Sequence, residues 1–291
     1  MFQVNISMIS LIRTAMKIWN IWPKGLTAVL LFSAALTLAG LALAHVHPIL
    51  LPLLSTIAVY PQYLFYITTK RFKKAVTLIL AWALLLTFII ILFSFYMPKT
   101  ASKIILNGEN YKKEMFEWIK TGQGPEGDPK LFIAPKIKEI VLFSLLAFIT
   151  VGFAALLLGA YLLNYMNYYV GILLLHAKPG VASFATVAIF SWPIYAIIRV
   201  VGYVCLGVAL TWFSYTFLSD TLLRKFMKAK LGPLYSITEK FFRRRRKLIN
   251  VASVKNILLI AAVAIALDFL LKATVANLVY QPILYANTVI P

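Results

Sequence analysis

The sequence predicts an all-α protein that crosses a membrane several times, with about five full spans and one broken or re-entrant helical segment. Hydrophobic residues occupy 62% of the 291 positions and charged residues only 13%, whereas about a quarter of the residues of a soluble protein are charged. Six apolar runs of 19 residues or more follow one another, and roughly 20 apolar residues in a helix cross about 30 Å of hydrocarbon. The period-two alternation of barrel strands does not occur in these runs, so we expect the spans to be helices.

The N-terminal part of the chain predicts a surface segment followed by three spans. Residues 1–25 are basic and amphipathic, which is typical of a segment that lies along the cytoplasmic face of a membrane. The apolar run 26–44 is longer than the core of a cleaved signal peptide, so we expect it to remain as the first span. Residues 26–97 therefore hold three transmembrane helices, with a cytoplasmic loop at 69–74.

The distribution of charge predicts which side of the membrane each loop occupies. Residues 70–74 hold four Lys or Arg and no acid, and residues 219–256 hold eleven against two acids. Short cytoplasmic loops collect Lys and Arg, so both segments are expected in the cytoplasm. Residues 98–139 hold eight Lys and six of the nine acids, which predicts a long extracytoplasmic loop. The amphipathic stretch 110–122 within it predicts a short helix that caps the outer mouth of the bundle.

The second half of the chain gives a conflict in the number of crossings. The uncharged run 140–175 is interpreted as one long transmembrane helix that returns to the cytoplasm. Residues 181–218 must then enter and leave on the same side, and Pro193 at their centre disrupts a helix, which favours a broken pair of short helices. The rival interpretation is a straight span that violates the charge rule at one loop. Residues 257–291 form the final span and a short extracytoplasmic tail.

A cluster of tyrosine and asparagine side chains interrupts the run 140–175. Four tyrosines and two asparagines fall within 161–169. One hypothesis is an aromatic belt at the inner interface, where Tyr is enriched, with Asn164, Asn167 and a track of glycines packing against another helix. The alternative is that Tyr165 and the two asparagines line a cavity that holds a ligand.

Charged residues inside apolar runs are the strongest functional candidates, because each costs roughly 2.5–3.5 kcal/mol at a helix centre on insertion scales. Asp268 and Lys272 are four residues apart and share one helix face. Arg199 follows the Pro193 break and is expected to reach Asp268. These residues either form an ion pair that fixes helix packing or bind an anionic group, a proton or an ion.

The remaining polar features predict no chemistry. His45 and His47 are a weak candidate for a metal site, because no cysteine or acid is near them in the sequence. Cys205 is the only cysteine, which excludes an intrachain disulfide, and its apolar neighbours indicate a buried side chain. We find no catalytic motif and expect no cofactor and no nucleic-acid partner. Juxtamembrane basic clusters contact anionic lipid headgroups, and the candidates here are Arg243, Arg244, Arg245, Arg246 and Lys247.

The leading functional hypothesis is a non-enzymatic protein of a prokaryotic plasma membrane that handles a lipid or small solute in a polar intramembrane pocket. The alternative is a structural or anchoring subunit of a larger membrane complex, whose partners would be other membrane subunits. A membrane enzyme acting on lipid headgroups is disfavoured by the scarcity of acids in the spans. A cavity that reaches Asp268 would favour the first hypothesis, and apolar faces without a cavity the second. Clustered carboxylates or histidines would favour the third.

Overall fold

The described part of the chain is helical, as the sequence predicts. The computed structural model describes the backbone of residues 22–231 and 251–291 and the side chains of 22–218 and 254–291. Within these ranges there is no β-strand, and one isolated bridge joins Ala177 to Thr288. The elements are α2 (Leu26–Leu43), α3 (Leu50–Thr68), α4 (Phe72–Tyr96), α5 (Pro98–Ile104), α6 (Gly108–Thr121), α7 (Pro129–Ile149), α8 (Phe153–Leu175), α9 (Val181–Phe190), α10 (Ile194–Leu231), α12 (Val251–Val275), the π-helix η2 (Ala276–Tyr280) and α13 (Gln281–Asn287).

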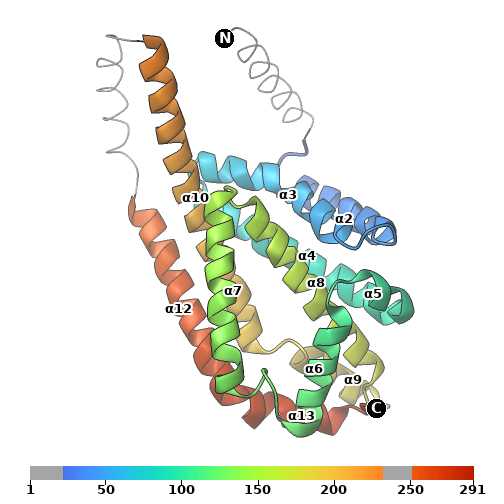
Figure 1. Ribbon diagram of the computed structural model, residues 1–291. Helices are drawn as coiled ribbons and strands as arrows, with labels where there is room; N and C mark the ends of the chain where they lie inside the picture. The colour runs from blue at the N-terminus through green and yellow to red at the C-terminus, as the bar shows by residue number, and fades with distance from the viewer. Residues whose placement is uncertain (1–21, 232–250) are drawn as a thin grey trace.

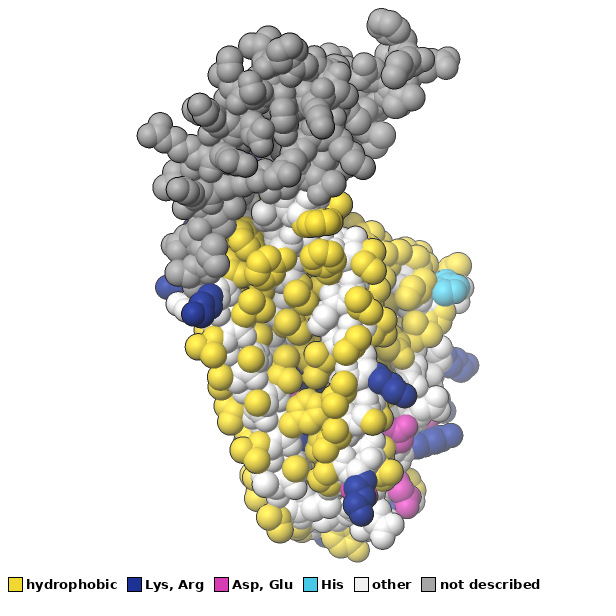
Figure 2. All heavy atoms as spheres, turned by 60° about the vertical axis from the view of Figure 1, so that its left-hand side comes forward, with side chains coloured by type: hydrophobic (Ala, Val, Ile, Leu, Met, Phe, Trp, Pro, Cys, Tyr) yellow, Lys and Arg dark blue, Asp and Glu magenta, His cyan; other side chains and the backbone are white. Residues whose placement is uncertain are grey.

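The helices are long and apolar enough for a multi-pass membrane protein. Six stretches in the described residues meet that criterion, and their outward faces are apolar. On α12, for example, Leu259 and Leu270 are 63% and 60% exposed. Hydrophobic side chains cover most of the face that Figure 2 turns forward. The six stretches are Leu26–Leu43, Leu50–Thr68, Phe72–Tyr96, Phe153–Leu175, Val181–Leu218 and Val254–Asn287.

Helices α7, α10 and α12 run between two ends of the molecule, whereas α2 and α3 lie across this direction in the view of Figure 1. Helices α7, α10 and α12 lie side by side, with α10 in contact with both of its neighbours. The short helices α6, α9 and α13 pack together at one end, which we call the α6 end. Helix α10 finishes and α12 begins at the opposite end. The amphipathic helix expected near 110–122 is therefore present as α6, at the end of the bundle.

The sequence predicts a single helix over 140–175. This prediction is wrong, because the chain turns back in the middle of that range. Helix α7 ends at Ile149 and α8 begins at Phe153. Between them, Gly152 adopts a left-handed backbone with φ of 87°, and a Cβ there would collide with the side chain of Thr211. Helix α7 runs away from the α6 end and α8 returns to it (Figure 1). The break contains no charged residue, so hydropathy alone does not reveal it.

The turn between α7 and α8 also changes the path expected for 181–218. The break at Pro193 is confirmed, since α9 ends at Phe190 and α10 begins at Ile194. However, the two helices do not enter and leave at the same end. Helix α9 stays at the α6 end, whereas the 38-residue α10 runs the full length of the molecule (Figure 1). One crossing by α10 is sufficient because α7 and α8 together already return the chain to the α6 end.

Helices α4 and α8 pack closely through the asparagine side of the Tyr/Asn cluster. A Cβ on Gly171 would lie 2.7 Å from the backbone oxygen of Ile91, so only glycine fits this crossing. Asn167 donates to Thr87 Oγ1 of α4 at 3.3 Å, and Asn164 is buried. The helix-packing seam is therefore present at Asn167 and Gly171. Helix α8 carries the cluster toward the α6 end (Figure 1), and the aromatic belt at the inner interface stays a prediction.

Candidate functional site

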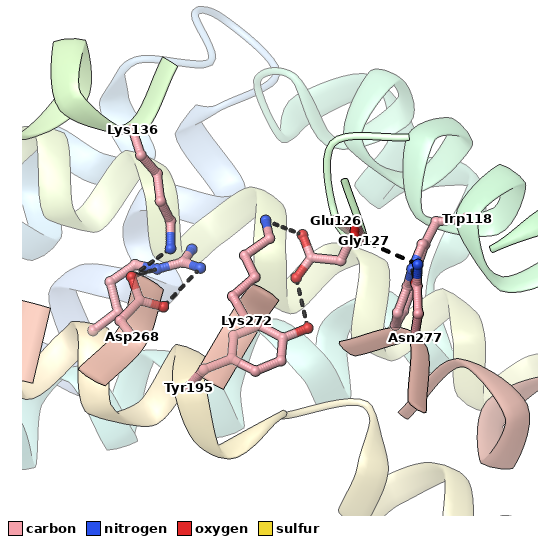
Figure 3. Close-up of polar contacts among 9 residues, drawn as sticks. Trp118, Glu126, Gly127, Lys136, Tyr195, Asp268, Lys272 and Asn277 are labelled. Carbon is pink, nitrogen blue, oxygen red and sulfur yellow. Dashed lines mark hydrogen bonds and ion pairs between the residues drawn. The ribbon is translucent and has the colours of Figure 1, made fainter. Parts of the chain in front are cut away.

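The candidate site is a network of buried charges between α7, α10 and α12. Asp268 on α12 is only 2% exposed and accepts hydrogen bonds from Arg199 on α10, at 3.1 Å from Nε and 3.3 Å from Nη2. Lys136 on α7 donates to the same carboxylate. The expected contact between Arg199 and Asp268 is therefore present. One carboxylate holds two cations from two other helices, as Figure 3 shows for Lys136.

Lys272 lies on the same helix but pairs with another acid. Its Nζ donates to Glu126 Oε2 at 2.8 Å, and Tyr195 Oη donates to Glu126 Oε1 at 2.7 Å (Figure 3). The sequence predicts that Asp268 and Lys272 share a face, and both do face the interior, but Asp268 is already occupied by Arg199 and Lys136. The loop between α6 and α7 instead brings Glu126 to Lys272.

The surroundings of Glu126 favour its ionised form. Burial raises the pKa of this carboxyl, but the charges of Lys272 and Arg199 and the hydrogen bonds from Lys272 and Tyr195 outweigh the burial. The pKa of Glu126 therefore lies below its ordinary value of 4.5. Glu126 is an anion at neutral pH and can balance the charge of Lys272.

Lys136 and Glu126 were not predicted as site residues, because both fall in the stretch expected to be an extracytoplasmic loop. Helix α7 in fact begins at Pro129, and the side chain of Asp128 caps it by accepting from Lys130 N at 2.8 Å. An N-cap aspartate followed by proline at the first helical position is a recognisable helix start. That signal places Lys136 two turns inside the helix, within reach of the other spans.

An aromatic ring separates the two lysines of the site. Phe132 on α7 lies 4.7 Å from Lys272 Nζ and 5.7 Å from Lys136 Nζ, measured to the ring centroid. Phe269 on α12 lies 5.0 Å from Lys136 Nζ. Cations are attracted to the faces of such rings, which helps to hold the lysines in a buried position without further acids.

Three cavities meet at Arg199. The first has a volume of about 80 Å³, is mostly apolar and runs between α8 and α10, from Glu139 to Tyr63 and Thr211. The second has a volume of about 140 Å³ and is lined by charged side chains. The third is a small space of about 10 Å³ at the break between α9 and α10. Arg199 and Met166 line all three, so the cavities are neighbours. The charged side chains around the second cavity are Glu114, Glu126, Lys136, Glu139, Arg199 and Lys272.

The structure divides the Tyr/Asn cluster between two roles. Tyr165 lines both the apolar and the charged cavity, as expected if part of the cluster faces a ligand. Asn164 and Asn167 are buried and line none of the three cavities, and Asn167 belongs to the packing against α4. Glu139, which was not among the predicted site residues, accepts from Tyr203 Oη at 2.7 Å and faces the same two cavities as Tyr165.

The C-terminal helices hold the loop that carries Glu126. Trp118 on α6 donates from Nε1 to Asn277 Oδ1 at 2.8 Å, and Asn277 Nδ2 donates to the carbonyl of Gly127 at 3.4 Å (Figure 3). Gln281 donates to the carbonyl of Ile119 at 2.6 Å. These bonds join α6, η2 and α13 into a cap over the charged cavity.

The other predicted residues lie apart from this site. His45 and His47 are exposed in the connection between α2 and α3, and His47 Nδ1 accepts from Ile49 N at 3.3 Å. Cys205 is buried. Among the described residues, no group of three His, Cys, Asp or Glu could hold a metal ion. The basic cluster Arg243, Arg244, Arg245, Arg246 and Lys247 lies outside the described residues, as does most of the segment 1–25.

Comparison with known proteins gives no relative from which a function could be transferred. No family model, no curated protein and no solved structure matches this chain. The function therefore has to be argued from the site.

Proposed function

We propose that this multi-pass membrane protein binds an amphiphile, a lipid with a charged headgroup, in the cavities that meet at Arg199. The observation that carries the proposal is the junction of a charged cavity with an apolar one. A headgroup would lie among Lys136, Arg199 and Lys272, and its hydrocarbon chain would follow the apolar cavity along α8 and α10. The proposal assigns binding and no chemical step.

The shape of the apolar cavity supports this proposal over a small polar solute. Its walls are mostly aliphatic and aromatic side chains of α4, α8 and α10. At its far end the polar side chains of Tyr63 and Thr211 form a hydrogen bond with each other at 2.8 Å. Burial of hydrocarbon contributes roughly 0.8 kcal/mol per CH₂ group. A small ion would gain nothing from this space, whereas an acyl or prenyl chain would.

The charges support a ligand that exchanges ion pairs with the protein. Buried ion pairs are costly unless their geometry is good, and charged residues inside a membrane are rare. Lys136 and Arg199 share the single carboxylate of Asp268, so each cation keeps N–H groups that this carboxylate does not engage. A headgroup with negative oxygen atoms would accept from those N–H groups and compete with the acids that line the same cavity, Glu114, Glu126 and Glu139.

Mass spectrometry of the purified protein in nanodiscs, under conditions that preserve bound lipid, tests the proposal. Gly159 lines the apolar cavity, and a Cβ at this position would meet no atom within 4 Å. Gly159→Leu should therefore fill the cavity without disturbing α8, and we expect it to abolish retention of lipid. Ala154→Leu, on the same helix but outside the cavity, is the matched control and should keep it. A protein that copurifies with other subunits and holds no lipid would overturn the proposal in favour of an anchoring role.

A further inference from the structure

The smallest of the three cavities, which we call the break chamber, has walls rich in hydrogen-bond donors. It lies between α6, α8 and the break at Pro193, has a volume of about 10 Å³, and adjoins the charged cavity, with which it shares Glu126 and Arg199. A space of this size holds about one water-sized group. Tyr169 of α8 and Trp192 of the break line it, together with Arg199. Neither Tyr169 nor Trp192 was among the site residues predicted from the sequence.

Two of these donors have no partner in the protein. The hydroxyl of Tyr169 and the Nε1 of Trp192 are both buried and make no hydrogen bond. Tyr169 is only 2% exposed. A buried donor without a partner costs about 1–3 kcal/mol, and buried polar groups are almost always satisfied. Both residues line the chamber, so an acceptor atom placed there would lie beside them.

The start of α10 adds positive potential to the same chamber. Pro193 and Ala196 line it, and the first N–H groups of a helix carry a partial positive charge that favours anions. This helix is 38 residues long. The N–H of Ile194 already donates to Tyr280 Oη at 2.9 Å, and that of Ala196 to the carbonyl of Pro193 at 2.9 Å. The helix terminus therefore contributes through its dipole, and the hydroxyl of Tyr169 and the Arg199 guanidinium supply the donors.

The acid in the chamber does not compete for these donors. Glu126 also lines the wall, but its two carboxylate oxygens accept from Lys272 and Tyr195. Arg199 bonds to Asp268 through Nε and Nη2, and shares that carboxylate with Lys136. The free hydrogen-bonding capacity of the chamber is therefore that of donors next to a cation.

We propose that the break chamber receives one oxygen atom of an oxyanion, a phosphate or carboxylate group whose other atoms lie in the adjoining charged cavity, with Tyr169 and Trp192 as donors and Arg199 as the cation. The inference rests on the proposed function, because it makes this oxyanion part of the amphiphile's headgroup, and it names the class of lipid as anionic. A cationic or purely hydroxylated headgroup would leave the two donors and the helix terminus without an acceptor of matching charge.

The test compares two lipids with the same chains and one free anion. Purified protein is titrated with dioleoyl phosphatidic acid, with dioleoylglycerol and with inorganic phosphate, and binding is measured by native mass spectrometry. We expect phosphatidic acid to bind at least about tenfold more tightly than dioleoylglycerol, since hydrogen bonds to a charged group contribute roughly 1.5–3 kcal/mol. Tyr169→Phe and Trp192→Phe should each lower the affinity for phosphatidic acid about tenfold and leave the affinity for dioleoylglycerol unchanged.

Tyr168→Phe is the matched control for Tyr169→Phe. It removes the neighbouring hydroxyl, which donates to Glu109 outside the chamber, and should not alter either affinity. If both lipids bind with equal affinity and Tyr169→Phe changes neither affinity, the proposal of an oxyanion in the break chamber is overturned. The amphiphile proposal would then still stand, and water would be the partner of the two donors. If inorganic phosphate binds as tightly as phosphatidic acid, the result supports oxyanion binding in the break chamber and overturns the proposal that the ligand is an amphiphile. No binding of any of the three would overturn both.

Discussion

At the scale of single residues, Asp268 determines how two cations are held inside the bundle. Its carboxylate accepts from Arg199 and Lys136, which belong to two other helices. Removing one member of a buried ion pair leaves an uncompensated charge and typically costs about 3–5 kcal/mol. Asp268 therefore acts as a positioning residue, because it does not line the cavities itself but fixes two side chains that do.

Asp268→Asn should accordingly destabilise the protein by about 3–5 kcal/mol, since Arg199 and Lys136 would remain buried without a counter-ion. Thermal unfolding of the purified protein in detergent measures the effect. Glu117→Gln on the exposed side of α6 is the control and should change little. Adding Lys136→Met to Asp268→Asn should recover part of the loss, because it removes one of the two unpaired cations. A mild effect, equal to that of Glu117→Gln, would contradict this account of the network.

The stability of the protein should also depend on Glu126 at low pH. Its pKa is lower in the folded protein than the ordinary value of 4.5, so the folded state binds this proton less readily than the unfolded state. The stabilisation by Glu126 is complete above the unfolded pKa and is lost as the pH falls through the lowered folded pKa. The midpoint temperature of thermal unfolding, measured from neutral to strongly acidic pH, should thus fall less steeply with decreasing pH in Glu126→Gln than in the wild type. Identical slopes would show that Glu126 does not contribute.

The sequence singled out three of the five charged residues of this network. Arg199, Asp268 and Lys272 are conspicuous because each is a charge within an apolar run. Lys136 and Glu126 are not, because they lie among other charged residues and look like parts of a solvated loop. The partner of Lys272 could not be predicted from spacing on α12, since it comes from a loop whose fold depends on the cap formed by α6, η2 and α13.

At the scale of elements, the turn between α7 and α8 determines the path of the second half of the chain. The residues of the turn are apolar, so hydropathy predicts one helix where the structure has two. The signal present in the sequence is Gly152, which adopts φ of 87°, a conformation that costs other residues about 1–2 kcal/mol. A single glycine within an apolar run is too common to identify a turn without the packing against Thr211.

Gly152→Ala should therefore destabilise the protein more than an alanine substitution at another glycine with a left-handed backbone conformation. The new Cβ would meet Thr211, whose hydroxyl accepts from Tyr63 at 2.8 Å and cannot turn away without losing that bond. At Gly122, the C-cap of α6 with φ of 72°, a new Cβ would meet only Gln281, at 4.0 Å. We expect Gly152→Ala to lower the free energy of unfolding by about 1–3 kcal/mol more than Gly122→Ala. Equal losses in thermal unfolding would mean that the contact with Thr211 does not constrain the turn.

At the scale of the whole molecule, composition was sufficient for the class of fold but not for the order of crossings. Apolar content and run length predicted a helical multi-pass protein, and the six long apolar helices agree with it. The error in the path came from one missed turn, which reversed the direction of α8 and made α10 a single long helix between the two ends, whereas α12 runs in the expected direction. With that turn in place, the path of the helices is compatible with both basic segments on one side of a membrane and needs no re-entrant pair.

The arrangement of the helices makes a definite prediction about sidedness in the membrane. The α6 end carries the acid-rich segment 98–139, and the opposite end leads into the basic segment 219–256. Since cytoplasmic loops collect Lys and Arg, we expect the α6 end to face outward. Cys205 is the only cysteine, so replacing it with serine gives a background in which a single new cysteine reports its own position.

Lys113→Cys on α6 and Lys73→Cys at the start of α4 are matched probes, because both lysines are exposed and lie in helices joined to different loops. In intact cells, a membrane-impermeant maleimide should label Lys113→Cys at once and Lys73→Cys only after the membrane is permeabilised. The reverse pattern would place the acid-rich segment in the cytoplasm and contradict the charge rule for this chain. Labelling of both positions in intact cells would mean that α4 does not cross the membrane, and the path from α4 through α10 would then have to be redrawn.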